Sequence, residues 1–150
     1  MKNVYDPKVA SELITRIEDL EPETQPLWGK MSLGQMLAHV NVSYEMAFED
    51  KHTHAKGLKQ LMLKLLVKPS VVNEKPYRKN LRTAPAFLMT DERIFDLEKA
   101  RLIAYINMTA ERGEAFFNGL RSPSFGPLTA NEWNNLLYKH IDHHLRQFGV

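Results

Sequence analysis

The sequence predicts an all-α fold, a four-helix bundle in a single domain over residues 1–150. Four stretches carry apolar residues at steps of three and four, the spacing of one face of an α-helix. No stretch alternates apolar and polar residues over the length of a strand. With 150 residues, 43% of them hydrophobic, the chain is long enough to bury one sizeable core.

The first helix is predicted to begin at Pro7. Asp6 is a preferred N-cap residue type, and proline is favoured at the first helical position. The helix is expected to end before Pro22. Apolar residues follow at helical steps, at Val9, Leu13, Ile17 and Leu20.

Two further helices begin at capping boxes, in which Ser or Thr is followed three residues later by Gln or Glu. Ser32 and Gln35 mark the start of the second helix, predicted over residues 33–49. Thr129 and Glu132 mark the start of the last helix, which is expected to end at a glycine near the C-terminus.

The third long helix is predicted from about Thr90 to Asn118-Gly119, which is a helix-stop signature. This helix would be long for a soluble protein, so the alternative is that its first residues form a separate turn. Residues 121–127 are predicted to form a loop because they contain two prolines and a glycine.

A short basic helix is predicted over residues 56–68, between the second and third long helices, with Pro69 as its stop. Residues 70–90 show no sustained period and are predicted to form a long loop, a feature typical of lids and binding loops. The short helix has one apolar face, made by Leu58, Leu61, Met62, Leu65 and Leu66.

The net charge of +2 conceals an uneven distribution. Residues 51–82 hold nine basic residues and one acidic residue, whereas the rest of the chain holds eleven basic and seventeen acidic residues. The favoured interpretation is a solvated face whose leucines pack into the core, and the second is attraction of an anionic substrate. Binding to a membrane surface or nucleic acid comes third, because Tyr77 and Phe87 are too few for a stacking platform.

Two imidazoles lie on the apolar face of the last helix. His140 and His144 are one turn apart, and Asp142 points away from them, so no carboxylate shares their face. Burying unpaired imidazoles is costly, and a shared metal ion satisfies them. The other residues of this face are Leu137, Ile141 and Phe148.

A third ligand must come from another helix. The H-E-x-x-H protease motif fails because Ile141 replaces the glutamate that serves as general base. His39 is the only other histidine on a helical face that borders an apolar one. Three imidazoles with an open coordination position are typical of a catalytic metal site, although satisfied core histidines remain the alternative. His143 is an alternative ligand to His144, or it supports a ligand without binding the metal, or it is exposed.

Two other polar side chains are candidates to orient a ligand or substrate. Gln35 lies one turn before His39, and Asn107 lies in the third long helix. The alternative is that both face solvent or a neighbouring helix. His52 and His54 fall in a polar link and are expected to be solvated.

The absence of cysteine excludes disulfides, thiolate zinc sites and a cysteine nucleophile, and it suits a cytoplasmic protein. The first residues lack the apolar segment of a signal peptide, and no apolar run is long enough to span a bilayer. We therefore expect a cytoplasmic location and no membrane span.

The residues at 37–39 and 138–149 resemble the DinB-like superfamily. More narrowly, they resemble a branch known as a domain of unknown function, whose members end in a run of the type His-x-Asp-His-His-Leu-Arg-Gln-Phe-Gly. The segment 28–32, Trp-Gly-Lys-Met-Ser, which precedes the second helix, is also similar to this branch. The resemblance covers nearly the whole chain, and its C-terminal run is the most specific part.

This resemblance implies an up-down-down-up four-helix bundle that holds a divalent ion, zinc or nickel, through three histidines. Carried over residue by residue, these are His39, His140 and His144. The resemblance also implies one of two kinds of activity. One is that of thiol-dependent transferases or isomerases, which use low-molecular-weight thiols such as bacillithiol or mycothiol, and the other is that of metal-dependent hydrolases. Many members of the superfamily form homodimers. Relatives often carry His-Pro before an aromatic residue, whereas this chain has Ser122-Pro123. The role of the relatives' histidine therefore does not transfer to this chain.

The leading hypothesis is a metal-dependent enzyme of the thiol-transferase kind with a small-molecule substrate. Residues 51–82 would cover the mouth of the site and attract an anionic low-molecular-weight thiol. The alternatives are a metal-dependent hydrolase, and a non-catalytic bundle that binds a small molecule or a partner through its basic segment.

Overall fold

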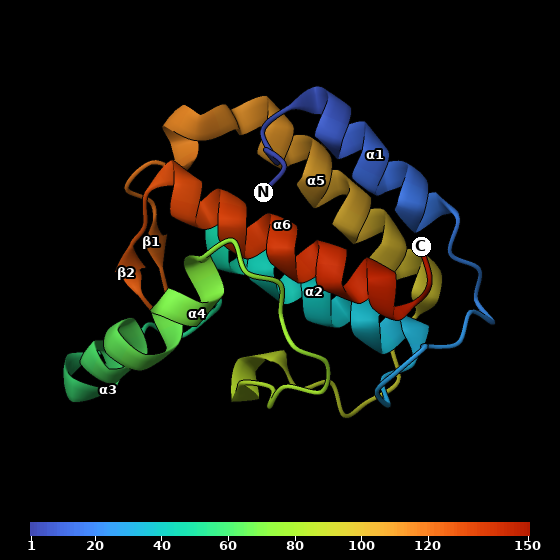
Figure 1. Cartoon of the computed structure of the whole chain (residues 1–150), viewed down its shortest axis with the longest axis horizontal. Coiled ribbons are helices and arrows are strands. Elements are labelled where there is room, and N and C mark those ends of the chain that lie inside the picture. Colours follow the sequence, from blue (N-terminus) through green and yellow to red (C-terminus); the bar gives the residue numbers. More distant parts are fainter.

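The computed structural model describes residues 1–150 and consists mainly of helices (Figure 1). A small antiparallel hairpin, absent from the predicted all-α fold, occupies the segment predicted as a loop. Its strands are β1 (Arg121–Ser122) and β2 (Gly126–Pro127). The four long helices are α1 (Pro7–Glu18), α2 (Leu33–Phe48), α5 (Phe95–Phe117) and α6 (Ala130–Gln147).

The long helices surround one cluster of buried apolar side chains. In Figure 1, α1 and α6 run in one direction and α2 and α5 in the other. Helix α2 packs against both α5 and α6, and α1 packs against α5. Each long helix contributes fully or almost fully buried side chains to this cluster, among them Leu13, Leu37, Ile106 and Ile141.

The predicted starts of α1, α2 and α6 are confirmed. The Asp6 side chain accepts a hydrogen bond from the Lys8 amide at 2.9 Å, with Pro7 at the first helical position. Both capping boxes, at the starts of α2 and α6, are complete. In each box the hydroxyl of the cap residue accepts from the backbone amide three residues later, and the side chain of that later residue accepts from the backbone amide of the cap residue. The ends of the four long helices lie within about three residues of their predicted places, as expected for fraying termini.

Helix α5 is shorter than predicted. It begins at Phe95 because Ile94 is extended, with φ −78° and ψ 114°, so the residues from Thr90 onward form a separate segment. Gly113, with φ 64°, interrupts the helix before its end, and Gly119, with φ 87°, follows the C-cap Asn118.

The prediction that Pro69 ends the short basic helix was wrong. The chain remains helical through α3 (Gly57–Met62), a π-helical turn (Leu63–Val67) and α4 (Lys68–Val72). In the π turn the Lys68 amide bonds to the carbonyl of Leu63, five residues back. Pro69 then falls in the first turn of α4, a position at which proline is tolerated.

The prediction that the apolar face of this helix packs into the core was also wrong. Leu58, Leu61, Met62, Leu65 and Leu66 are each between 51% and 72% exposed. Side chains of the opposite face, Leu63 and Val71, pack against the core instead.

A long connection follows α4, as predicted. Its longest regular element is a 3₁₀ turn, Pro85–Phe87. This turn lies beside α2 and brings Phe87 against His39, with ring centroids 5.4 Å apart. None of the helices is both long and apolar enough to cross a membrane.

We predict that Gly34→Ala destabilises the protein although alanine favours helix. A Cβ at this position in the first turn of α2 would lie 2.3 Å from the Arg93 carbonyl oxygen, which is backbone and cannot rotate away. Overpacking of this kind costs about 1–3 kcal/mol, and urea unfolding measures it. Ser11→Ala, at an exposed position of α1, is the control and should change the free energy of unfolding by less than about 0.5 kcal/mol. Equal stabilities for the two variants would contradict the close packing.

Candidate metal centre

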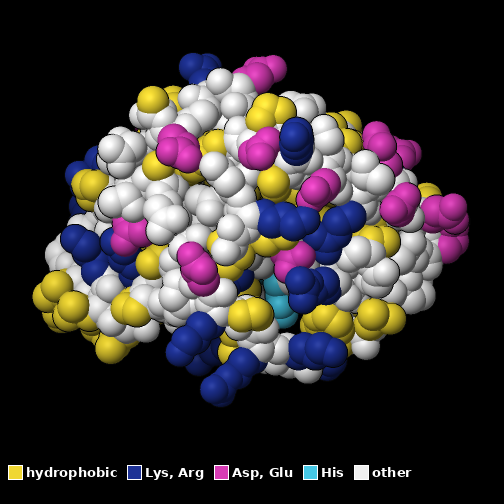
Figure 2. All heavy atoms as spheres, turned by 45° about the horizontal axis from the view of Figure 1, so that its top comes forward, with side chains coloured by type: hydrophobic (Ala, Val, Ile, Leu, Met, Phe, Trp, Pro, Cys, Tyr) yellow, Lys and Arg dark blue, Asp and Glu magenta, His cyan; other side chains and the backbone are white.

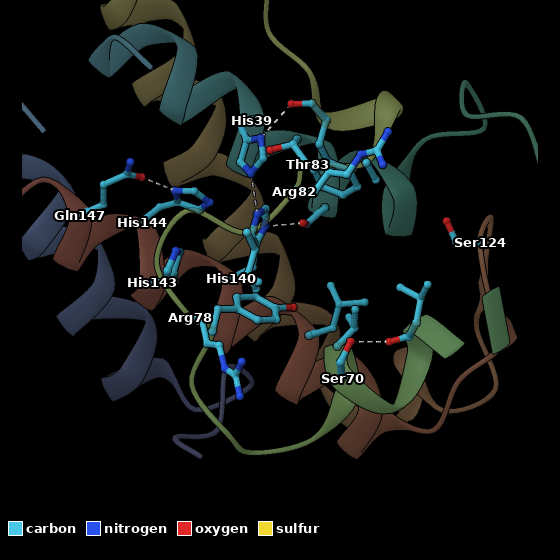
Figure 3. A pocket seen from close by; sticks show the side chains of 18 of the residues that line it. His39, Ser70, Arg78, Arg82, Thr83, Ser124, His140, His143, His144 and Gln147 are labelled. Carbon is cyan, nitrogen blue, oxygen red and sulfur yellow. Dashed lines mark hydrogen bonds between the residues drawn. The ribbon is translucent and has the colours of Figure 1, made fainter. Parts of the chain in front are cut away.

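Three histidines from two helices meet at one point of the structure (Figure 3). His39 comes from α2, and His140 and His144 come from successive turns of α6. The Nε2 atoms of His39 and His140 are 2.9 Å apart, and one nitrogen from each of the three rings lies within 4.8 Å of the others. The packing of α2 against α6 therefore assembles the cluster that the sequence predicted.

Each ring is held from behind through its Nδ1 atom. His39 Nδ1 lies 2.8 Å from the backbone carbonyl of Phe87, and His140 Nδ1 lies 2.7 Å from Ser43 Oγ. His144 Nδ1 lies 2.8 Å from the amide oxygen of Gln147. Such outer partners are characteristic of metal-ligating histidines, because they fix the orientation and the tautomer of the ring.

Two of these partners determine where the ring protons lie. The Phe87 carbonyl can only accept, so His39 Nδ1 carries a proton and its Nε2 has a free lone pair. The Gln147 amide nitrogen donates to the Trp28 carbonyl at 2.6 Å, which turns its oxygen toward His144. His144 therefore also donates from Nδ1 and keeps a lone pair on Nε2.

His140 has a partner that can act in two ways. In the metal-free chain its Nε2–H must donate to the lone pair of His39 Nε2, so its Nδ1 accepts from the Ser43 hydroxyl. A hydroxyl can also accept a hydrogen bond. If a cation replaces the proton between the two Nε2 atoms, His140 can change its tautomer and donate from Nδ1 to Ser43 without losing a bond. The donor set therefore fits a divalent metal ion.

Burial keeps the three imidazoles neutral. It lowers the pKa of His39 and, with help from neighbouring imidazoles, lowers the pKa of His140 well below its usual value and that of His144 to about 3. No carboxylate opposes this effect, since Asp142 binds Arg16 and Arg146, each at 2.9 Å. Neutral imidazoles are the form that binds metal.

The cluster forms part of the wall of a cavity of about 660 Å³. Its walls are largely apolar, with contributions from Met46, Leu63, Phe87, Phe125 and Leu136. Lys30, Arg78 and Arg82 line the same cavity and are exposed. Figure 2 shows histidine at the bottom of a hollow, between Lys and Arg side chains.

Over residues 7–149 the chain matches the family described as "Protein of unknown function (DUF1569)". The chain belongs to this family. The match agrees with the coarser part of the resemblance, a domain of unknown function, and assigns no reaction to it. No curated protein and no solved structure matches this DUF1569 chain.

The alternative ligand His143 lies outside the three-histidine group of this DUF1569 protein. Its ring packs edge-on against Trp28 and Tyr77, with centroids 5.8 and 5.7 Å away, and it lines the same cavity. The geometry therefore groups His144, and not His143, with His39 and His140.

The structure does not bring the other two predicted residues to the site. The Gln35 side chain completes the α2 capping box and donates to the Asp91 carbonyl at 3.1 Å, which holds it at the end of the helix. Asn107 is exposed on α5. His52 is not solvated as expected, because it bonds to the buried Glu45 at 3.0 Å.

Three contacts of the cluster were missed from the sequence. Ser43 lies one turn after His39, and Gln147 lies three residues after His144, so helical spacing could have indicated both. The carbonyl of Phe87 left no signal, because any residue carries one and the contact spans 48 positions.

We predict that the metal-free protein loses stability as the pH falls below 6.5. A histidine whose folded pKa is depressed binds fewer protons in the folded state than in the unfolded one, so acid favours unfolding. For His144 the loss is about 1.4 kcal/mol per pH unit between 6.5 and the folded pKa of about 3, and His39 and His140 add to it.

Urea unfolding of chelator-treated protein at a series of pH values measures this slope. His144→Gln should reduce the slope, whereas His54→Gln, at a half-buried histidine outside the cluster, should leave it unchanged. A stability that does not vary between pH 7 and pH 5 would contradict the burial of neutral imidazoles.

Proposed function

We propose that this DUF1569 protein is a metal-dependent enzyme in which His39, His140 and His144 hold a divalent ion, Zn²⁺ or Ni²⁺. The observation that carries the proposal is the convergence of three ring nitrogens whose opposite nitrogens are all anchored. Three protein ligands leave a coordination position open, as in catalytic zinc sites.

We further infer that the chain is a single DinB-like domain with an up-down-down-up four-helix bundle. The directions of α1, α2, α5 and α6 in Figure 1 and the shared core support this topology. The three histidines come from the second and the last long helix, as the resemblance implies.

The chemistry we propose is a thiol-dependent transfer. When bound, a divalent ion with an open position makes a thiol or a water molecule nucleophilic near neutral pH. Ser43, Gln147 and the Phe87 carbonyl hold the three rings in place, and the apolar cavity walls limit the access of bulk water.

The cavity suggests the kind of molecule that reacts there. Its apolar walls suit an uncharged organic body, and the exposed Lys30, Arg78 and Arg82 suit a carboxylate or phosphate at the mouth. An anionic low-molecular-weight thiol in the cytoplasm would meet both requirements as a co-substrate.

We predict that protein purified without a histidine tag contains close to one equivalent of Zn²⁺ or Ni²⁺, as measured by elemental analysis. His39→Ala, His140→Ala and His144→Ala should each lose the metal, because two imidazoles hold an ion far more weakly than three. His143→Ala and His54→Ala should retain it, since neither belongs to the cluster.

The proposal fails if the untagged protein holds no divalent ion and neither Zn²⁺ nor Ni²⁺ raises its Tm. If the metal is present, assays of an electrophile with and without thiol separate the two reactions. Turnover that requires no thiol would identify a hydrolase instead of a transferase.

We predict that Ser43→Ala and Gln147→Leu each weaken zinc binding by about 10- to 100-fold, because each removes the group that orients one ligand. Competition with a chromophoric zinc chelator measures the affinity. Asn107→Ala is the matched control, since it removes an exposed polar side chain that belongs neither to the cluster nor to the cavity wall. Unchanged affinity in both variants would show that the anchors do not support a bound metal.

A further inference from the structure

The helical segment 57–72 presents a row of large apolar side chains to solvent. We call this row the leucine ridge: Leu58, Leu61, Met62, Leu65 and Leu66. In Figure 1, α3 projects from one end of the molecule, away from the long helices. In Figure 2, hydrophobic side chains gather at this end. Five neighbouring side chains at least half exposed form a patch of the kind that marks an interaction site.

The orientation of the ridge is held from the other side of the segment. Lys139 Nζ donates to the backbone carbonyls of Ser70 and Asn73 at 2.8 and 2.6 Å. Asn135 donates to the Val72 carbonyl at 2.9 Å, so two side chains of α6 fix the end of the segment. The ridge therefore cannot turn inward unless these bonds break.

The charged residues of the segment itself are all basic. No acidic residue occurs between Lys51 and Glu74. Lys56, Lys59 and Lys64 are exposed and form no ion pair, whereas Lys68 pairs with Glu132 at 2.6 Å. Lys59 follows Leu58 and Lys64 precedes Leu65 in the chain, so both lysines lie next to residues of the ridge.

We propose that the leucine ridge docks on an anionic lipid surface. An exposed apolar row bordered by lysines can enter the boundary between headgroups and acyl chains while the lysines meet lipid phosphates. A symmetric contact with a second copy would place Lys59 and Lys64 of both chains together, and the repulsion opposes it. A homodimer, which the family resemblance implies, would then use another face.

Docking would also bring the cavity close to the lipid. Leu63, Val67 and Val71 lie on the same segment as the ridge and line the cavity. The segment is thus a wall between the cavity and the surface on which we place the lipid. This proposal needs no metal, so it stands or falls separately from the proposed function.

The test is co-sedimentation of the full chain with phosphatidylcholine vesicles, with and without phosphatidylglycerol, at low and at physiological salt. Wild-type protein should bind the anionic vesicles and bind the neutral ones at least about tenfold more weakly, with the difference shrinking as salt increases. The double variant Leu65→Ser/Leu66→Ser should lose at least about tenfold in affinity for both. Lys59→Glu/Lys64→Glu should lose the preference for anionic lipid.

Matched controls separate the ridge from surface changes in general. Leu97→Ser, at a leucine of α5 that is 54% exposed, and Lys8→Glu, at an exposed lysine of α1, should bind as wild type does. His140→Ala should also bind, because the metal cluster takes no part in docking. Unchanged Tm values show that the variants of the ridge, of its lysines and of Leu97 and Lys8 are folded.

Three results would overturn the proposal. One is absence of wild-type binding to anionic vesicles at low salt. Another is equal binding by the ridge variants and their controls. The third is a wild-type dimer in light scattering that Leu65→Ser/Leu66→Ser converts to a monomer, which would make the ridge an interface between copies.

Discussion

The contact between α2 and α6 is the interaction on which the rest of the site depends. It takes three imidazoles out of bulk water without supplying a carboxylate to compensate them. Burial then forces the neutral form, and a neutral imidazole has one nitrogen that donates and one that accepts. Because hydrogen bonds hold each Nδ1, the Nε2 atoms are directed at one another, an arrangement that a cation satisfies.

Helix α6 also positions the segment that closes the cavity. Lys139 immediately precedes His140 and binds the end of α4, and its burial lowers its pKa to about 8. After α4 the chain returns to the cluster, where the Phe87 carbonyl anchors His39. One helix therefore carries two of the three histidines and holds the connection that orients the third.

The chemistry of this protein has to be argued from its site, because the family it belongs to has no assigned reaction. The same short helical segment contributes apolar side chains to the cavity and a row of leucines to the surface. Its lysines and the arginines that follow it give this side of the protein a positive charge. An anionic, partly apolar environment is the one that such a surface fits.

The sequence alone determined the capped starts of α1, α2 and α6, the helical character of the chain and the grouping of His39 with His140 and His144. Caps and periodicity are local, so neighbouring residues suffice to specify them. Only the tertiary structure decided which face of residues 57–72 is covered, since an amphipathic pattern shows two faces without naming the one that meets a partner. The tertiary structure alone also showed that Ser43, Gln147 and a backbone carbonyl, and not Gln35, orient the three rings. The sequence could not show this, because those contacts depend on packing between distant segments.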